Sequence, residues 1–219
     1  VSNLFLLFVA ASILIYYIVP RKSQWIVLLI FSYLYYIAGG PRYVVFILFS
    51  TLVTWLMALL IEKAEGKENH KGARKLLILG LILNFGMLGI VKYTNFAVEN
   101  INALLHLNLR GIQLLLPLGI SFYTFQSSGY LLDVYWKRCK AERHPLKYAL
   151  FVSFFPQILQ GPIGRYSRLA DQLYAEHRFE GNNIIRGFER ILWGFFKKMI
   201  LADWAAVFAD AIFEDPAKY

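Results

Sequence analysis

Four long apolar runs dominate the first part of the chain. They cover Leu4 to Val19, Trp25 to Ala38, Tyr43 to Ile61 and Leu76 to Val91. A helix needs about 20 mostly apolar residues to cross the hydrocarbon core of a bilayer, and these runs approach that length. Pro20 and the Gly39-Gly40-Pro41 sequence separate them, because proline removes a backbone donor and glycine adds backbone freedom. The pattern predicts four membrane-spanning helices and a tight hairpin at 39–42.

The pattern changes in the middle of the chain. Asn95 to Gly111 is polar by comparison, which predicts an interfacial turn or a short helix. Ile112 to Tyr135 is apolar but interrupted by more polar residues than a helix facing lipid should carry. If this segment is helical after Pro117, one polar stripe forms at helical spacing, made of Tyr123, Gln126, Tyr130 and Asp133. We expect the stripe to face a cavity or a partner helix.

Shorter elements are expected towards the end of the chain. Tyr148 to Gln160 has only thirteen residues and stops at Gly161-Pro162, which is typical of a re-entrant segment buried in protein. Gly164 to Asn183 is charged and should lie in the cytoplasm or among lipid headgroups. From Ile184 onward, apolar and basic residues fall on opposite sides at helical spacing, which predicts an interfacial amphipathic helix.

Composition supports a membrane environment. The chain is 58% hydrophobic and 17% charged, so one soluble core of 219 residues could not bury its apolar surface. The predicted fold class is all-α, a multi-pass integral membrane bundle with re-entrant and interfacial amphipathic helices, formed by residues 1–219 as one membrane domain. The chain starts at Val1 instead of Met and ends in a loop-like segment, so we expect it to be the N-terminal part of a longer domain.

The basic residues predict an orientation in the cell membrane. Three loops, after Val19, after Ile61 and after Tyr135, hold twelve Lys and Arg residues, whereas the opposite side holds three, Arg42, Lys92 and Arg110. Cytoplasmic loops retain positive charge, so these three loops should be cytoplasmic, provided that 112–135 crosses the membrane. The same distribution explains the net charge of +9 without nucleic acid, because the charge is not gathered on one soluble face. The single cysteine, Cys139, indicates a reduced cytoplasmic thiol.

Two clusters could take part in chemistry. An ionisable residue inside a membrane is costly, so Asp133 could orient a catalytic group or line a polar route; alternatively, it pairs with Lys137 or Arg138 at the cytoplasmic end. In the second cluster, Gln160 and Arg165 flank a broken backbone that could cradle a thioester, pantetheine or phosphate group. The alternative is a tight turn in which Arg165 meets a lipid phosphate.

No residue of the chain is a convincing catalytic group. General-base or nucleophilic catalysis would need a His, a Cys or an activated Ser near the acyl group. All four histidines (His70, His106, His144 and His177) lie in polar connections, where a solvated role is expected. No spacing predicts a metal site or a bound cofactor.

Three segments resemble a known family. Leu115 to Arg138, Phe151 to Tyr166 and Gly187 to Asp203 are similar to the bacterial branch of the membrane-bound O-acyltransferase family, in particular to membrane proteins of alginate O-acetylation and teichoic-acid D-alanylation. The resemblance covers the whole chain, and its middle segment is the most specific. It implies that Gln126, Asp133, Gln160 and Arg165 line or shape a substrate tunnel.

The resemblance also implies an activity for the full-length protein. Such proteins transfer an acyl group, commonly acetyl, from a cytoplasmic thioester donor to an extracytoplasmic glycan or to an acyl-relay protein. The donor, acetyl-CoA or an acyl carrier protein, is a substrate and not a bound cofactor. The family histidine follows a tryptophan and is expected downstream of residue 219, so this chain alone should be inactive. A transporter or flippase subunit and a non-catalytic membrane scaffold remain alternatives.

Overall fold

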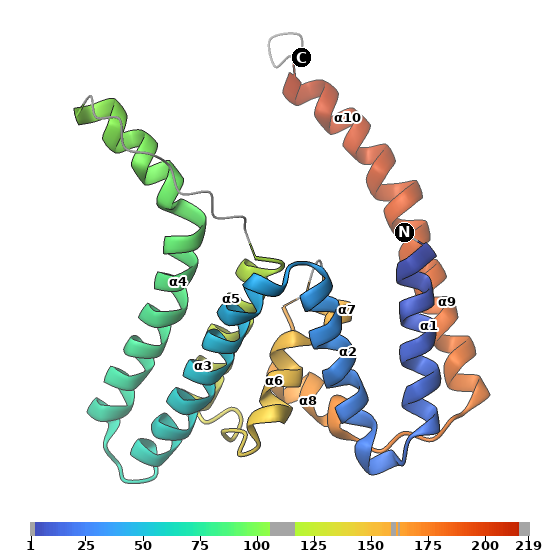
Figure 1. The fold of residues 1–219 in the computed structure, drawn as a ribbon, viewed down its shortest axis with the longest axis horizontal. Helices are drawn as coiled ribbons and strands as arrows, with labels where there is room; N and C mark the ends of the chain where they lie inside the picture. The colour runs from blue at the N-terminus through green and yellow to red at the C-terminus, as the bar shows by residue number, and fades with distance from the viewer. Residues whose placement is uncertain (1–2, 106–116, 159–160, 162, 215–219) are drawn as a thin grey trace. The chain divides into compact units, whose positions relative to one another are not determined.

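The computed structural model describes residues 3–105, 117–158, 161 and 163–214, and its regular elements are all helices (Figure 1). The all-α class predicted from the sequence is therefore confirmed for these residues. The chain divides into two compact units, Val1–His177 and Arg178–Tyr219, which are described separately.

Each of the four apolar runs forms a helix. These helices are α1 (Asn3–Ile18), α2 (Gln24–Ala38), α3 (Val44–Glu65) and α4 (His70–Leu105). Short 3-10 turns, η1 (Arg21–Ser23) and η2 (Pro41–Tyr43), connect the first three. Within the described ranges, two helices are long and apolar enough to cross a membrane, Pro41–Glu65 and His70–Leu105. Helices α1 and α2 have 16 and 15 residues. Each is therefore at most about 24 Å long, shorter than the hydrocarbon core of about 30 Å.

Helix α4 corrects one expectation. A separate turn or short helix was predicted from Asn95 to Gly111, but α4 continues without interruption to Leu105, and 106–111 lie outside the described residues. Polar side chains do not break it, because Thr94 and Asn100 donate hydrogen bonds to the carbonyl groups of Ile90 and Phe96, one turn earlier. Its 36 residues extend about 54 Å, well beyond a hydrocarbon core of about 30 Å.

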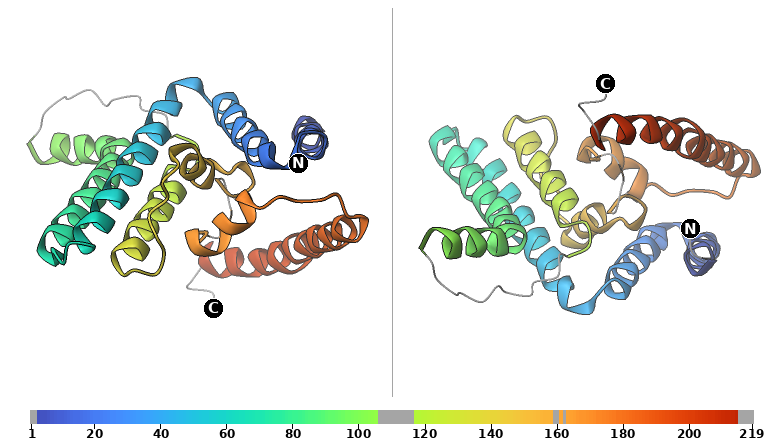
Figure 2. Two further views of the ribbon diagram at one scale, coloured as in Figure 1. Left: turned by 90° about the horizontal axis from the view of Figure 1, so that it is seen from below. Right: turned by 90° about the horizontal axis from the view of Figure 1, so that it is seen from above.

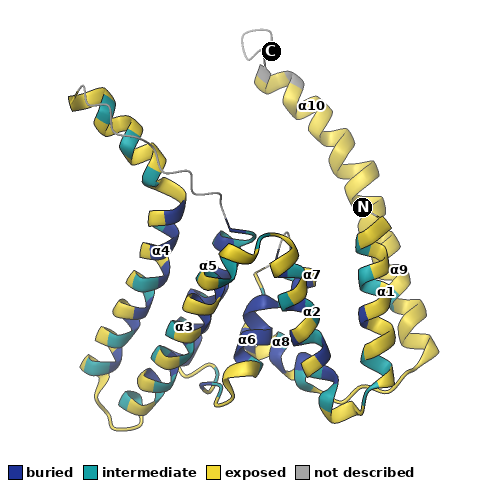
Figure 3. Ribbon diagram, viewed as in Figure 1, coloured by how far each residue is buried: buried dark blue, intermediate teal, exposed yellow. Residues whose placement is uncertain are grey.

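The first unit packs around α3, which contacts α4 and α5 (Ile120–Tyr135) most extensively. Buried residues face inward from these helices and exposed residues lie on their outer faces (Figure 3). Many of the exposed residues are apolar. At the α3–α4 contact, Asn84 Nδ2 donates to Thr54 Oγ1 (3.0 Å), and Ser50 Oγ donates to Asn84 Oδ1 (2.6 Å). Buried hydrogen bonds of this kind join helices whose outer surfaces are apolar.

The predicted re-entrant segment consists of short helices. These are α6 (Pro145–Ser153) and α7 (Phe155–Ile158), and they are followed by α8 (Tyr166–Tyr174). The helix breaks at Phe154, which has a non-helical ψ of 105°, and Pro156 lies in the first turn of α7, where its missing N–H removes no helical hydrogen bond. Most of α6 is buried, and both views in Figure 2 place it inside the first unit. The short, buried and broken character of the segment is as predicted; its depth in a membrane stays a prediction.

The second unit contains α9 (Gly181–Phe196), a π-helical segment (Lys197–Ala202) and α10 (Asp203–Glu214). Helix α9 is amphipathic: Ile184, Phe188 and Ile191 share one side, and Arg186 and Arg190 lie on the other. Nearly all of its side chains are exposed. The helix is therefore formed as predicted, and its position at a membrane interface stays a prediction.

Candidate functional site

The polar stripe of α5 is buried. Tyr123 and Tyr130 are almost fully enclosed, and Gln126 and Asp133 are 8% and 9% exposed. Gln126 Nε2 donates to the backbone carbonyl of Phe151 in α6 over 3.0 Å. The predicted stripe therefore forms a polar wall against neighbouring helices and does not face lipid.

Asp133 occupies the end of that wall near the basic loops. Its Oδ1 lies 3.5 Å from Arg138 Nη1, and its backbone carbonyl accepts a hydrogen bond from the Arg138 amide over 2.8 Å. The geometry favours the pairing alternative, because the carboxylate already has a cation beside it at the end of the helix. A role of Asp133 in orienting a catalytic group gains no support from these contacts.

The two remaining candidates of the sequence are Gln160 and Arg165. Gln160 lies outside the described residues. Arg165 precedes α8 with an extended backbone, and its side chain is exposed. Its exposure fits contact with a lipid phosphate as well as contact with a substrate. Of the three predicted residues that the structure describes, Gln126 is the one that contacts the broken helix.

Three glycines allow the backbone to pack closely around α7. Gly119 begins α5 with a φ of +66°, and a Cβ there would lie 2.2 Å from the carbonyl oxygen of Ile158. A Cβ on Gly161 would lie 2.8 Å from Gln157 Cα, and one on Gly164 would lie 3.1 Å from Gln157 Oε1. We call Gly119, Gly161 and Gly164, with Gln157 and Ile158, the α7 cradle. A larger residue at Gly119 or Gly161 would collide with backbone atoms of α7, whereas one at Gly164 would displace the Gln157 side chain.

Gln157 is the polar residue at the centre of this cradle. Its Oε1 is buried and has no hydrogen-bond partner among the described residues. The side-chain amide of Gln126 faces the same glycine. A Cβ on Gly164 would lie 3.1 Å from Gln157 Oε1 and 3.8 Å from Gln126 Nε2, so the two glutamines approach Gly164 together. An unpaired buried amide oxygen costs about 1–3 kcal/mol, so it marks a place where a polar group of a ligand or a water can bind.

More unpaired oxygens lie in the same helices. The hydroxyls of Thr124 and Ser128 in α5 and of Ser153 in α6 are buried without a partner in the described part of the chain. The sequence pattern and the family resemblance indicated Gln160 and Arg165 of the second cluster as tunnel residues and did not single out Gln157. Spacing could not separate the two glutamines, because α7 is too short for a helical face to be recognised. The glycines at 161 and 164, which approach Gln157, were the available signal.

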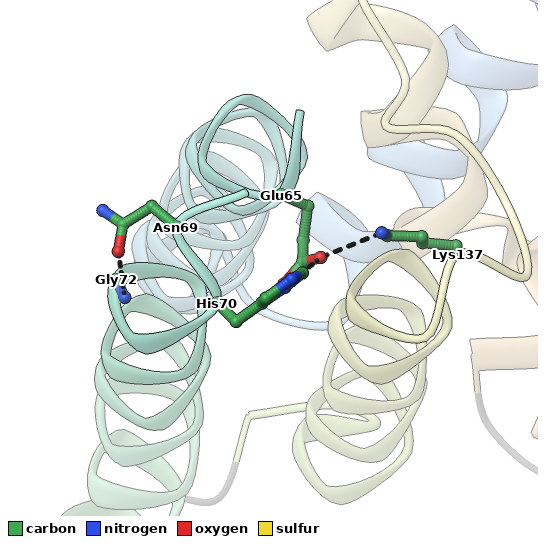
Figure 4. A network of polar contacts seen from close by, with 5 residues as sticks. All are labelled: Glu65, Asn69, His70, Gly72 and Lys137. Atoms are coloured by element: carbon green, nitrogen blue, oxygen red, sulfur yellow. Dashed lines mark hydrogen bonds and ion pairs between the residues drawn. The ribbon is translucent and has the colours of Figure 1, made fainter. Parts of the chain in front are cut away.

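Ion pairs hold the helices together at the basic end of the unit. Glu65, at the end of α3, has a side chain that is 8% exposed. Its Oε2 lies 2.9 Å from His70 Nδ1 in α4 and 3.1 Å from Lys137 Nζ after α5 (Figure 4). The loops after Ile61 and after Tyr135 therefore meet at the same end, as the charge distribution predicts.

The segment from Cys139 to His144 is fixed onto this end by Glu142. Its backbone carbonyl accepts a hydrogen bond from Trp55 Nε1 (2.9 Å), and its backbone amide donates to the Tyr130 hydroxyl (2.7 Å). Its carboxylate accepts a hydrogen bond from the Tyr166 hydroxyl over 2.6 Å. Glu142 thus connects α3, α5 and α8 through one residue.

A pocket of about 360 Å³ opens beside this segment. It is lined by residues 139–143 and by the first turns of α8, with Lys140 and Arg143 opposed by Glu142 and Asp171. Burial, followed by the neighbouring Asp133 and Glu62 carboxylates, raises the pKa of the Cys139 thiol to about 11. The thiol is therefore protonated at neutral pH and is not an activated nucleophile.

The histidines have the exposed positions expected from the sequence. His70, His144 and His177 are exposed, and His106 lies outside the described residues. His177 nevertheless has partners: its Nδ1 is 2.8 Å from the Tyr16 hydroxyl, and its backbone exchanges two hydrogen bonds with the Gln24 side chain. None of the three lies in the α7 cradle. No group of metal-binding side chains occurs among the described residues.

Comparison with known proteins finds clear relatives. The chain is 35% identical over 219 residues to the probable alginate O-acetylase AlgI of Pseudomonas syringae pv. tomato, covering 97% of this chain and 41% of that protein. It is 34% identical over 220 residues to that of Pseudomonas aeruginosa, with the same coverage of 97% and 41%. It is also 33% identical over 216 residues to the peptidoglycan O-acetyltransferase of Helicobacter pylori, covering 87% of this chain and 40% of the relative.

The chain spans about two fifths of the length of these curated relatives. No family model matches it, and no solved structure matches it. The homology nevertheless extends over nearly the whole chain and includes both segments that form the α7 cradle. The resemblance found in the sequence is thereby confirmed: the chain is a partial counterpart of the bacterial O-acetylases, homologous to alginate O-acetylases and to a peptidoglycan O-acetyltransferase.

Proposed function

We propose that the chain forms part of a multi-pass O-acyltransferase of the cell (inner or cytoplasmic) membrane that acetylates a cell-surface polysaccharide. Homology to O-acetylases supports the reaction class. The observation that carries the location of the site is the unpaired, buried Oε1 of Gln157 in the α7 cradle, beside the amide of Gln126. We infer that this polar wall lines part of the substrate tunnel.

In the proposed reaction, a cytoplasmic thioester, acetyl-CoA or an acyl-carrier protein, is the donor. The thioester C–S bond breaks and an ester C–O bond forms on a glycan hydroxyl or on an acyl-relay protein. The hydroxyl proton moves, through the catalytic base, to the leaving thiolate. That base is a histidine outside this chain, so residues 1–219 contribute binding and alignment and should transfer no acetyl group by themselves.

Gln157 has a specific part in this proposal. Its carbonyl oxygen can accept a hydrogen bond from an N–H group, such as a pantetheine amide, or from a sugar hydroxyl. Gln126 is less available, because its Nε2 already donates to the backbone of Phe151. Gln157 therefore orients substrate, while Gln126 holds α5 against α6.

Replacing Gln157 by leucine tests the proposal. In the full-length protein, we expect Gln157→Leu to lower kcat/KM for transfer of radiolabelled acetyl groups by about threefold to tenfold, the value of one hydrogen bond. The matched control is Gln172→Leu, at an exposed position of α8, which should leave kcat/KM unchanged. Equal activity of the two variants, both with wild-type thermal stability, would contradict a substrate contact.

Two other functions remain open to experiment. Broken helices also mark transporters and flippases, and a membrane scaffold would need no catalytic residue. If the full-length protein, assayed with its partner proteins, transfers no acetyl group from acetyl-CoA or from an acylated carrier protein, the acyltransferase proposal fails. Acetate esters on an extracellular polysaccharide that disappear on deletion of the gene would support it.

A further inference from the structure

A second, apolar groove lies away from the α7 cradle. It has a volume of about 480 Å³ and is bounded by side chains of α2, α3 and α6. Pockets of about 300–1,000 Å³ are large enough for small ligands. Ile30, Leu48, Leu52 and Leu146 form its rim, and each of them is between 48% and 55% exposed. The groove therefore opens sideways onto the apolar surface of the unit.

The lining has little capacity to bind a polar ligand. Its polar groups are the hydroxyls of Tyr33 and Thr51, which lie beside each other, are shielded from solvent and have no clear hydrogen-bond partner among the described residues. Trp55 uses its Nε1 to bind the carbonyl of Glu142, so it presents only its ring to the groove. An occupant must therefore bring apolar surface and few hydrogen-bonding groups, as an acyl chain does.

Basic residues lie towards the end of the groove nearest the loops, where Arg143 is paired with Glu62 and Arg21 and Lys22 are exposed. Pro145 and Leu146, which line it, directly follow Arg143 and His144. The His144 ring packs edge-on against Trp25 at 5.4 Å, which brings η1 and its exposed Arg21 and Lys22 to the same end. Cytoplasmic leaflets carry anionic lipids, and such a cluster attracts their headgroups.

We propose that this groove binds one acyl chain of an anionic phospholipid, whose headgroup lies beside Arg21 and Lys22. The lipid would fill the space between α2, α3 and α6 and hold α6, and with it the α7 cradle, in position. The inference rests on the membrane location proposed above, but not on acyl transfer.

Quenching of Trp55 fluorescence tests this inference. The protein is reconstituted in phosphatidylcholine vesicles that contain a small fraction of phosphatidylglycerol with brominated acyl chains. The fluorescence of Trp55 is obtained by subtracting the emission of the Trp55→Phe variant from that of the wild type. We expect quenching that saturates at a low fraction of the anionic lipid. The same bromines on phosphatidylcholine should quench about fivefold less effectively, because Arg21 and Lys22 favour the anionic headgroup.

A variant in which larger side chains fill the groove provides a second test, again read out by quenching of Trp55. Ile30→Phe together with Leu48→Phe should abolish the saturable quenching, whereas Leu79→Phe, on an exposed face of α4 outside the groove, should leave it unchanged. Equal quenching by both lipids, unaffected by filling, would show ordinary lipid contact and overturn the proposal. No quenching at all would mean that protein covers the groove, which also overturns it. Flotation of the protein with the vesicles, measured in parallel, separates these results from a failure of membrane insertion.

Discussion

Two residues show how burial changes the chemistry of a side chain in this chain. Gln157 Oε1 is buried and has no hydrogen-bond partner in the described part of the chain, which is the basis for the proposed substrate contact. Cys139 is expected to react slowly for a related reason, because burial and nearby carboxylates raise the pKa of its thiol and disfavour the thiolate. Neither property could be recognised from residue type alone, since both depend on neighbours that are distant in sequence.

The raised pKa of Cys139 leads to a prediction about its reactivity. Its maleimide labelling rate should keep rising with pH up to about 11, and at pH 7.5 it should be about tenfold to a hundredfold slower than that of an ordinary exposed thiol. The control moves the cysteine by one residue to the exposed position 140, in Cys139→Ser with Lys140→Cys. Similar rates and similar pH profiles for the two proteins would refute a perturbed thiol.

At the scale of elements, close packing against glycines holds helix α7 in place. Four residues make barely one helical turn, so the α7 helix has almost no stability by itself. The close contact of Gly119 with the Ile158 carbonyl and of Gly161 with Gln157 keeps it between α5 and the following connection. The Phe155 amide adds a hydrogen bond to Ser32 Oγ in α2 over 3.2 Å.

Gly119→Ala should therefore damage the fold. A left-handed backbone costs an alanine about 1–2 kcal/mol, and the contact of 2.2 Å with a backbone oxygen adds a steric conflict. We expect a clear fall in the thermal unfolding temperature in detergent. Gly129→Ala is the control, because a Cβ there meets nothing within 4 Å and alanine favours the helical backbone of α5. If both variants unfold at the same temperature, the α7 cradle is not tightly packed.

At the scale of the whole first unit, the basic loops gather at one end. Helix α5 starts near the 39–43 hairpin, where Leu118 approaches Gly39, and ends beside Glu65, where Lys137 forms its ion pair. Helix α5 therefore runs from one end of the bundle to the other, as a segment that crosses the membrane would. The crossing of 112–135 and the orientation in the cell stay predictions based on the positive-inside rule.

Cysteine labelling of intact cells can test that orientation. In a Cys139→Ser background, a cysteine at exposed position 42 should react with a membrane-impermeant maleimide, and one at exposed position 67 should react only after the cells are opened. The reason is that the connection between Ile61 and Leu76 holds five of the twelve basic residues, whereas the hairpin holds one. Labelling of position 67 from outside would invert the topology.

The sequence alone determined the helical class, the four apolar helices, the buried stripe of α5 and the broken segment before Gly161. These features depend on local periodicity and on the backbone limits of proline and glycine, which act over a few residues. The resemblance of Leu115–Tyr166 to O-acyltransferases was equally readable, because it lies in the order of residues itself.

Only the tertiary structure decided which polar residues form a site. It turned Asp133 towards Arg138, left Arg165 exposed, extended α4 past Asn95 and brought Gln157 next to Gln126. These outcomes depend on contacts between segments far apart in the chain, such as the Gln126 amide with the Phe151 carbonyl. A periodic pattern predicts which face of a helix is polar. Packing between distant segments decides which partner meets that face, and therefore which oxygen remains without a hydrogen bond.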